Sequence, residues 1–236
     1  MTEPESNYVF ITGANRGLGL SLVVRFLSGG FRVFAGVRNP SLDRVANIPP
    51  AACLISLDVT SPESINQAVR KTREITSALD ILINNAGVHL KAEAATLEEL
   101  DLADGHLERT LAVNAFGSLR VTQQFLPLLE RGRGKLILNI SSEAGSIADC
   151  WRNREFAYSM SKSALNMQSK LLENYLAPRG FHVLAVHPGW MRTDMGGQNA
   201  DISPDQSAEG IFSLATKGGL PEDDIYLDYE GKPLRW

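Results

Sequence analysis

The amino-acid sequence predicts an α/β fold: a doubly wound parallel sheet of about seven strands, flanked by helices on both faces. Short runs that are almost entirely apolar recur along the chain, and a stretch of helical length and amphipathic pattern follows most of them. Strands that are buried on both faces of a parallel sheet have this uninterrupted apolar character. In addition, the first run leads directly into a glycine-rich turn, as the first strand–helix unit of many such sheets does.

The expected elements follow from these apolar runs and from the start signals of helices. Ser61 and Pro62 occupy the capping position and the first position of one predicted helix, where these residue types are favoured. The expected strands are Tyr8–Thr12, Arg32–Val37, Cys53–Leu57, Ile81–Asn84, Lys135–Ile140, His182–Val186 and Ile225–Leu227. The expected helices are Gly17–Leu27, Ser61–Leu79, a segment near Ala103–Leu129, Ala157–Leu176 and a last one that begins at Ser203-Pro204-Asp205.

Length and composition indicate one globular domain over residues 1–236. The chain has 236 residues, of which 44% are hydrophobic and 21% charged, and no linker rich in Pro, Gly and Ser divides it. The formal net charge is −4, and the sequence has no long basic run. Both properties argue against nucleic acid as a partner.

Cysteine content and hydropathy predict a cytoplasmic protein. The two cysteines, Cys53 and Cys150, are too few for a disulfide framework. The acidic start of the chain, Met1–Glu5, lacks the basic region of a secretion signal. No apolar run approaches the ~18 residues that a membrane helix needs, so we expect no membrane partner.

The glycine-rich turn is the first candidate binding feature. Its sequence is Thr12-Gly13-Ala14-Asn15-Arg16-Gly17-Leu18-Gly19, a G-x-x-x-G-x-G pattern. Glycine permits a tight turn and a close approach of the backbone to a pyrophosphate, and the following helix presents its N–H groups to the phosphates. The alternative is a strand–helix turn that binds nothing, but its place at the first junction favours a nucleotide.

The end of the second expected strand indicates which dinucleotide binds. An acidic residue about 20 positions beyond the glycine motif usually binds the ribose hydroxyls of NAD. Here the strand ends Gly36-Val37-Arg38-Asn39, and Asp43 is too far beyond the strand to be this acidic residue. Arg38 and Arg16 instead offer two guanidinium groups that suit the 2′-phosphate of NADP(H). The alternative is that both are solvated surface arginines.

Tyr158 and Lys162 form the most informative local pattern. They are four residues apart, so on a helix they share one face. A free tyrosine has a pKa of about 10, and a nearby cation lowers it, which suits the phenol to act as a general acid or base. A chance pair on an amphipathic helix is the alternative. Ser141 and Ser142 follow the fifth strand, where a hydroxyl faces the ligand crevice, and either could orient a substrate oxygen.

The order and spacing of these motifs resemble the short-chain dehydrogenase/reductase family over nearly the whole chain. The matching motifs are Thr12-Gly-x-x-x-Gly-x-Gly19, Leu57-Asp58-Val59, Asn84-Asn85-Ala86-Gly87, Asn114, Ser142, Tyr158-x-x-x-Lys162 and His187-Pro188-Gly189. The stretch 187–197 and the end 228–236 further resemble the carbonyl reductases grouped with sniffer and the bacterial C-factor. The resemblance implies a single-domain Rossmann fold, bound NADP(H), a small-molecule carbonyl substrate and a homodimer or homotetramer.

The resemblance also implies a role for each matching residue. Tyr158 would be the general acid/base, Lys162 would lower its pKa and bind the nicotinamide ribose, and Ser142, which precedes x-x-Gly, would stabilise the carbonyl. Asn114 would hold a water that links Lys162 to solvent, although a backbone-bonded kink residue is its alternative. The implied cofactor-binding residues are Gly13, Asn15, Arg16, Gly17, Leu18, Gly19, Arg38, Asp58, Val59, Asn85, Ala86, Gly87, Tyr158, Lys162, Pro188, Gly189 and Thr193, with no metal.

Within that set, Asp58 and Val59 would contact the adenine, although Asp58 could also cap the next helix. Residues 85–87 would run beside the adenine ribose, and Pro188, Gly189 and Thr193 would shape the nicotinamide end. The implied activity is NADPH-dependent reduction of a ketone or aldehyde to an alcohol by hydride transfer, with Tyr158 as the acid. The alternatives are a β-ketoacyl thioester reductase and a non-catalytic NADP-sensing protein, which could dispense with the tyrosine and the lysine.

Two loops complete the expectations about the site. Residues 147–156 are polar with aromatics, and we expect them to lie over the substrate mouth. Arg152 and Arg154 in this loop could bind an anionic substrate group or be solvated. Trp190 could line the substrate pocket or simply pack. The segment after Thr193 is short before the next helix, which predicts an open site.

Overall fold

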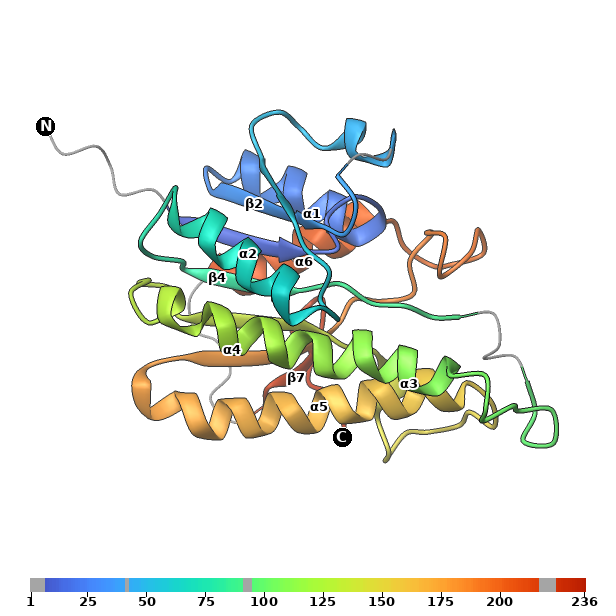
Figure 1. Ribbon diagram of the computed structural model, residues 1–236. Coiled ribbons are helices and arrows are strands. Elements are labelled where there is room, and N and C mark those ends of the chain that lie inside the picture. Colours follow the sequence, from blue (N-terminus) through green and yellow to red (C-terminus); the bar gives the residue numbers. More distant parts are fainter. Residues whose placement is uncertain (1–6, 41–42, 91–94, 217–223) are drawn as a thin grey trace, which may run out of the picture.

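The structure is a computed structural model that describes residues 7–40, 43–90, 95–216 and 224–236. Within these residues one parallel sheet contains seven strands in the order β3-β2-β1-β4-β5-β6-β7 (Figure 1). The strands are β1 Tyr8–Thr12, β2 Arg32–Val37, β3 Cys53–Ser56, β4 Ile81–Asn84, β5 Leu136–Ile140, β6 His182–His187 and β7 Tyr226–Asp228. The strand order reverses between β1 and β4, where doubly wound sheets bind ligands. The predicted fold class is confirmed.

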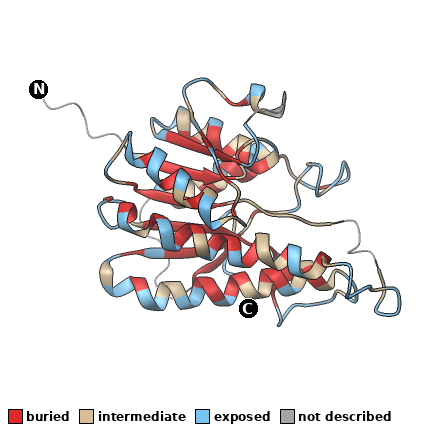
Figure 2. Ribbon diagram, in the orientation of Figure 1, coloured by how far each residue is buried: buried red, intermediate tan, exposed pale blue. Residues whose placement is uncertain are grey.

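Helices cover both faces of the sheet and bury its apolar strands. The helices are α1 Gly17–Ser28, α2 Pro62–Arg73, α3 His106–Leu111, α4 Ser118–Leu129, α5 Phe156–Leu176 and α6 Pro204–Thr216. Shorter turns are η1 Asp43–Asn47, η4 Glu143–Gly145 and η5 Ala177–Arg179, and η3 Ala112–Gly117 is a π-helical segment. One core cluster joins α1 and α6 to the sheet, and a second joins α2, α4 and α5 to its other face. Figure 2 shows that the strands and the inward helix faces are buried.

Two predicted helices differ from the observed ones. The helix expected over Ser61–Leu79 ends at Arg73, because the chain must turn before β4. Thr76 closes that turn through its hydroxyl, and the Leu79 N–H donates to the carbonyl of Leu128 (3.0 Å). The helix expected near Ala103–Leu129 is divided into α3, the π-helical segment η3 and α4.

The other predicted boundaries hold to within one residue. The fifth strand begins at Leu136 rather than Lys135, because Lys135 has a left-handed backbone (φ +44°) that strand geometry excludes. The third strand ends at Ser56 rather than Leu57, and the last strand runs from Tyr226 to Asp228. No helix among the described residues is long and apolar enough to cross a membrane.

Candidate functional site

The glycine turn brings α1 against the end of β4, and this contact requires glycine. Gly13 has a left-handed backbone (φ +65°), and a Cβ there would lie 2.9 Å from the Cα of Ala86. A Cβ on Gly19 would lie 2.2 Å from the carbonyl oxygen of Gly13. The side chain of Arg16, the capping residue of α1, makes no capping hydrogen bond, and the first turn of the helix contains no acidic residue. The N-terminus of α1 can therefore bind an anionic group.

Thr12 and Asn85 hold the turn in place. The Thr12 hydroxyl accepts hydrogen bonds from the backbone N–H groups of Asn85 and Ala86, both at 2.9 Å. The Asn85 amide nitrogen donates to the carbonyls of Thr12 (2.8 Å) and Gly13 (3.1 Å). Asn85 is expected beside a cofactor ribose, and in the structure its side chain also shapes the glycine turn.

The two arginines expected at the 2′-phosphate lie on the surface near the glycine turn and the end of β2. Arg38 is exposed directly after β2. Arg16 pairs with Asp194 at 2.8 Å, and the two side chains are 52% and 64% exposed. An exposed pair of this kind contributes only about 0–1 kcal/mol to stability, so a doubly charged phosphate can displace the carboxylate.

Asp58 and Val59 lie after β3, next to the start of α2. The Oδ1 atom of Asp58 accepts hydrogen bonds from the backbone N–H (2.8 Å) and the hydroxyl (2.6 Å) of Thr60. The cap of α2 is Ser61, whose hydroxyl accepts from the Ser64 N–H (3.2 Å), so Asp58 is not the cap. Val59 packs against η3, where a Cβ on Gly117 would lie 2.8 Å from its side chain.

The segment after β6 folds back over the glycine turn. Gly189 has a left-handed backbone (φ +80°), and a Cβ on Gly17 would lie 3.3 Å from the Thr193 methyl group. The Trp190 indole donates to the Gly196 carbonyl (2.8 Å) and is about half exposed. Pro188 begins the segment directly after β6.

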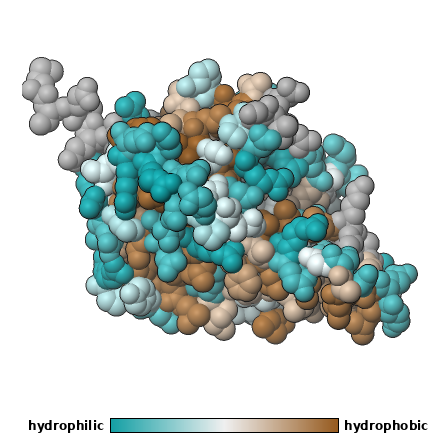
Figure 3. Space-filling view, in the orientation of Figure 1, coloured by the Kyte–Doolittle hydropathy of each residue, from teal (hydrophilic) through white to brown (hydrophobic). Residues whose placement is uncertain are grey.

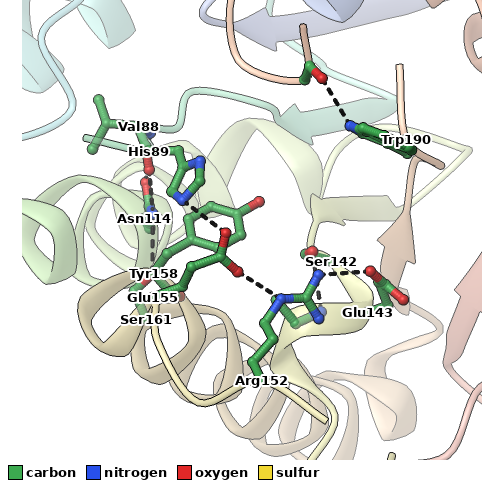
Figure 4. Close-up of polar contacts among 12 residues, drawn as sticks. Val88, His89, Asn114, Ser142, Glu143, Arg152, Glu155, Tyr158, Ser161 and Trp190 are labelled. Carbon is green, nitrogen blue, oxygen red and sulfur yellow. Dashed lines mark hydrogen bonds and ion pairs between the residues drawn. The ribbon is translucent and has the colours of Figure 1, made fainter. Parts of the chain in front are cut away.

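Tyr158, Lys162 and Ser142 meet at the carboxyl end of β5. Tyr158 and Lys162 lie one turn apart on α5, and the Lys162 Nζ is 5.7 Å from the centre of the tyrosine ring. The ammonium donates to the Ile140 carbonyl at 2.7 Å. Ser142 caps η4 by accepting from the Ala144 N–H (3.2 Å), and its side chain is near enough to the phenol to lower the phenol pKa. In Figure 4 the Tyr158 hydroxyl points toward the side on which Ser142 and Trp190 lie.

The neighbouring Ser141 faces the other way. Its buried hydroxyl donates to the Asn166 side chain in α5 at 2.6 Å. Of the two serines left open by the residues alone, Ser142 is therefore the one whose side chain lies beside the phenol.

Burial has the largest effect on the pKa values of Tyr158 and Lys162. Desolvation raises the pKa of Tyr158, and the Ser142 side chain opposes that rise. Arg152 also acts to lower the phenol pKa, and the effect of Lys162 on that pKa stays a prediction. Desolvation also lowers the pKa of Lys162 to about 8. The phenol is therefore protonated at neutral pH, as a proton donor must be.

Asn114 joins three elements around the reaction centre. It lies in η3, and its Oδ1 accepts from the Val88 N–H (2.8 Å) while its Nδ2 donates to the Val88 carbonyl (2.9 Å) and the Ser161 hydroxyl (3.0 Å). A Cβ on Gly87 would lie 3.5 Å from Asn114 Oδ1 and 3.9 Å from Lys162 Nζ. The side chain thus makes the backbone bonds of the kink alternative, and π-helical segments are frequent at functional sites.

The loop over residues 147–156 contains charged contacts that the sequence analysis missed. Arg152 is neither a free anion reader nor a solvated side chain, because Glu143 and Glu155 hold its guanidinium and its side chain is only 17% exposed. Arg154 is exposed. His89, which no motif singled out, packs against Tyr158 with the ring centres 4.5 Å apart. Glu155 and Glu143 lie only three and nine residues from Arg152, but no motif indicates that they pair with it, whereas His89 and Tyr158 come from distant segments.

Comparison with known proteins identifies the family. The short chain dehydrogenase family profile matches residues 7–202, so the chain belongs to this family of oxidoreductases, as the motifs predicted. The C-signal protein of Myxococcus xanthus is 36% identical over 165 residues, which cover 70% of this chain and 97% of that protein. The NADPH-bound carbonyl reductase from chicken fatty liver has a TM-score of 0.87 at 33% identity, over 99% of this chain and 100% of that one. Carbonyl reductase Sniffer of D. melanogaster has a TM-score of 0.88 at 30% identity, over 98% and 100%.

The buried lysine predicts a specific pH dependence of stability. The pKa of Lys162 is about 8 in the folded chain and 10.5 in the unfolded chain, so burial of its charge destabilises the fold most below pH 8. This loss is relieved as the pH rises toward 10.5, because only the unfolded chain then still binds the proton. From pH 7 to 9.5, the free energy of unfolding of the wild type should therefore rise by about 2 kcal/mol relative to that of Lys162→Met. Urea unfolding of both proteins across this pH range measures the change. A difference that stays constant over this range would contradict the burial of a charged lysine.

Proposed function

We propose that this protein is an NADPH-dependent carbonyl reductase, which reduces a ketone or aldehyde to an alcohol with Tyr158 as the general acid. The observation that carries the proposal is the convergence of the half-buried Tyr158 and the buried Ser142 side chain beside Lys162, at the carboxyl edge of the sheet. The family and the NADPH-bound structural relative support this assignment.

The residues around the glycine turn fit a dinucleotide phosphate. The turn leaves no room for a Cβ at Gly13 or Gly19, and the start of α1 offers uncapped N–H groups without a competing carboxylate. The Burkholderia multivorans relative, 29% identical with a TM-score of 0.81, was crystallised with NADP. When bound, the nicotinamide supplies the hydride.

Each group of site residues then has a part in holding the cofactor. Residues 13–19 would surround the pyrophosphate, and Arg16 and Arg38 would bind the 2′-phosphate. The remaining contacts would come from Asp58 and Val59 at the adenine, residues 85–87 at its ribose, Lys162 at the nicotinamide ribose, and Pro188, Gly189 and Thr193 at the nicotinamide end.

Side chains of the protein position the substrate oxygen and supply the proton. The Ser142 hydroxyl donates a hydrogen bond to the carbonyl oxygen and fixes its position. The Tyr158 phenol, protonated at neutral pH because burial raises its pKa, gives its proton to the same oxygen as negative charge develops there. The Lys162 ammonium stands near the ring to stabilise a transient phenolate, and Asn114 holds the strand extension and α5 together around it.

We also propose that the protein forms a homodimer or homotetramer through α4 and α5. Met167, Leu171 and Tyr175 recur every four residues along α5, so they lie on one helix face, and they are 63%, 61% and 68% exposed. Phe116 in η3 and Leu119 in α4 are also exposed. Figure 3 shows hydrophobic surface over the region where α4 and α5 lie. A second copy of the chain would remove this apolar area from water.

Removal of the phenolic hydroxyl tests the proposed acid. We expect Tyr158→Phe to keep NADPH binding and to lose roughly 10²-fold or more in kcat, because the proton donor is gone while the ring still fills its place. Absorbance at the NADPH band with a panel of ketones, aldehydes and quinones measures the rate, and Tyr175→Phe, at the far end of α5, is the matched control. Turnover near the wild-type rate would show that the phenol is not the acid.

Reversal of one surface charge tests the cofactor preference. Arg38→Asp should raise the ratio of NADH to NADPH efficiency, because a carboxylate repels the 2′-phosphate and can bind the ribose hydroxyls instead. Steady-state kcat/KM with each cofactor measures the ratio. Arg131→Asp, an exposed substitution after α4, should leave it unchanged. An unaltered ratio in Arg38→Asp would rule out phosphate recognition by this guanidinium.

A charge in the apolar stripe tests the assembly. Leu171→Glu should shift the protein toward monomers, because a buried carboxylate in the contact would be desolvated without a partner. Light scattering after size-exclusion chromatography measures the mass. Val24→Glu, at an exposed apolar position of α1, is the control and should keep the wild-type mass. If Leu171→Glu keeps the wild-type mass, the subunit contact does not lie on this face of α5.

A further inference from the structure

A row of alternating charges crosses the reaction centre. The Arg152 Nη2 contacts Glu143 Oε1 at 2.7 Å, and its Nε contacts Glu155 Oε2 at 2.6 Å. The other oxygen of Glu155 lies 3.5 Å from His89 Nε2. Figure 4 shows the guanidinium between the two carboxylates, with the histidine at the far end of the row.

The two carboxylates belong to the two segments that carry the reacting hydroxyls. Glu143 directly follows Ser142 and begins η4. Glu155 is the capping residue of α5, three positions before Tyr158. One guanidinium therefore ties the serine segment to the start of the tyrosine helix. We name this set of three side chains, Glu143, Arg152 and Glu155, the arginine bridge.

The arginine bridge ends at a residue with an unusual backbone conformation. Glu155 has a left-handed conformation (φ +60°), which is uncommon and costly for a residue with a Cβ. Such a conformation persists where its surroundings hold it, and here Arg152 bonds the Glu155 carboxylate, which also lies 3.5 Å from His89 Nε2. The Arg152 side chain is the most buried of the three, at 17% exposed against 49% for Glu143 and 32% for Glu155.

We propose that Arg152 is a positioning residue for the carbonyl reduction: it holds Ser142 and Tyr158 at the separation at which both reach one carbonyl oxygen. The inference rests on the proposed function, since it concerns the same two hydroxyls. A planar guanidinium can bond two carboxylates in different directions at once, whereas an ammonium is a point charge without that fixed fork. Because reaction rates are sensitive to about 1 Å of misplacement, a brace between these segments acts on the chemical step.

The bridge also balances charge around the phenol. The charged or titratable groups near Tyr158 are Glu143 from η4, Arg152 and Glu155 from the loop, Lys162 from α5, His89 from the segment after β4 and Tyr226 from β7. Glu143 and Glu155 act to raise the phenol pKa, and Arg152 acts to lower it. Loss of the guanidinium would leave two carboxylates without their cation, and the phenol would be harder to ionise.

Kinetics of Arg152→Gln, Arg152→Lys and the control Arg154→Gln on the full chain test the proposal. We expect Arg152→Gln to lose about tenfold or more in kcat, while KM for the carbonyl and Kd for NADPH stay within about twofold. Arg152→Lys should recover part of this loss, and Arg154→Gln should behave as the wild type. In the reverse direction, the rise of the alcohol oxidation rate with pH should move to higher pH in Arg152→Gln.

Several results would overturn the positioning role. These are a kcat of Arg152→Gln within twofold of the wild type, an equal loss in Arg154→Gln, or a loss that lies entirely in NADPH binding. Should Arg152→Gln fail to fold, Glu143→Gln removes one arm of the bridge at an exposed side chain, and a kcat unchanged by that variant would count against the proposal.

A second readout separates this inference from the proposed function. Hydrogen exchange of the NADPH-bound protein should show faster exchange in residues 143–158 of Arg152→Gln and unchanged exchange in α1 and α2. If the wild-type chain reduces no carbonyl, the proposed function fails, and the exchange rates still decide whether the bridge holds the two segments. Unchanged exchange in residues 143–158 would overturn the bridge itself.

Discussion

The hydrogen bonds between Thr12 and Asn85 are the contact on which the rest of the site depends. They join the ends of β1 and β4 at the point where the strand order reverses, and so they set the position of the glycine turn. Gly13 and Gly19 can then bring α1 within van der Waals distance of the backbone after β4. The glycine turn is thus built from backbone packing, and the side chains of Thr12 and Asn85 hold that backbone in place.

Buried polar side chains of β4 and β5 hold the helices around the reaction centre in place. The Asn84 amide donates to Asn139 (2.8 Å) and Thr122 (3.0 Å), and Asn139 donates to Ser169 (2.9 Å). These bonds connect β4 and β5 to α4 and α5, and they fix the helix that carries Tyr158. Buried polar networks of this kind define one arrangement of the elements, because any other arrangement leaves donors or acceptors unpaired.

Much of the fold and part of the site could be predicted from the sequence because those features are local. Each apolar run marks a strand, the glycine turn is a contiguous motif, and Tyr158 and Lys162 are one helical turn apart. Helix ends were less predictable, since the apolar pattern continues through Thr76 to Leu79 although the chain turns there to meet α4. The π-helical segment around Asn114 was not predictable, because Asn114 bonds a segment 26 residues away. The contacts of Arg152 are closer along the chain, but they depend on the path of an irregular loop that no motif defines.

The extended segment from Asn85 to His89 is shared by both halves of the site. At one end Asn85 shapes the glycine turn, and at the other the His89 ring lies on Tyr158. Between them, Gly87 lies beside Lys162 and Asn114, and Asn114 bonds both backbone groups of Val88. The two halves therefore do not form separable modules. A graft that exchanges the glycine turn for that of an NAD-binding relative would need to carry residues 85–89 with it to preserve the geometry around the tyrosine.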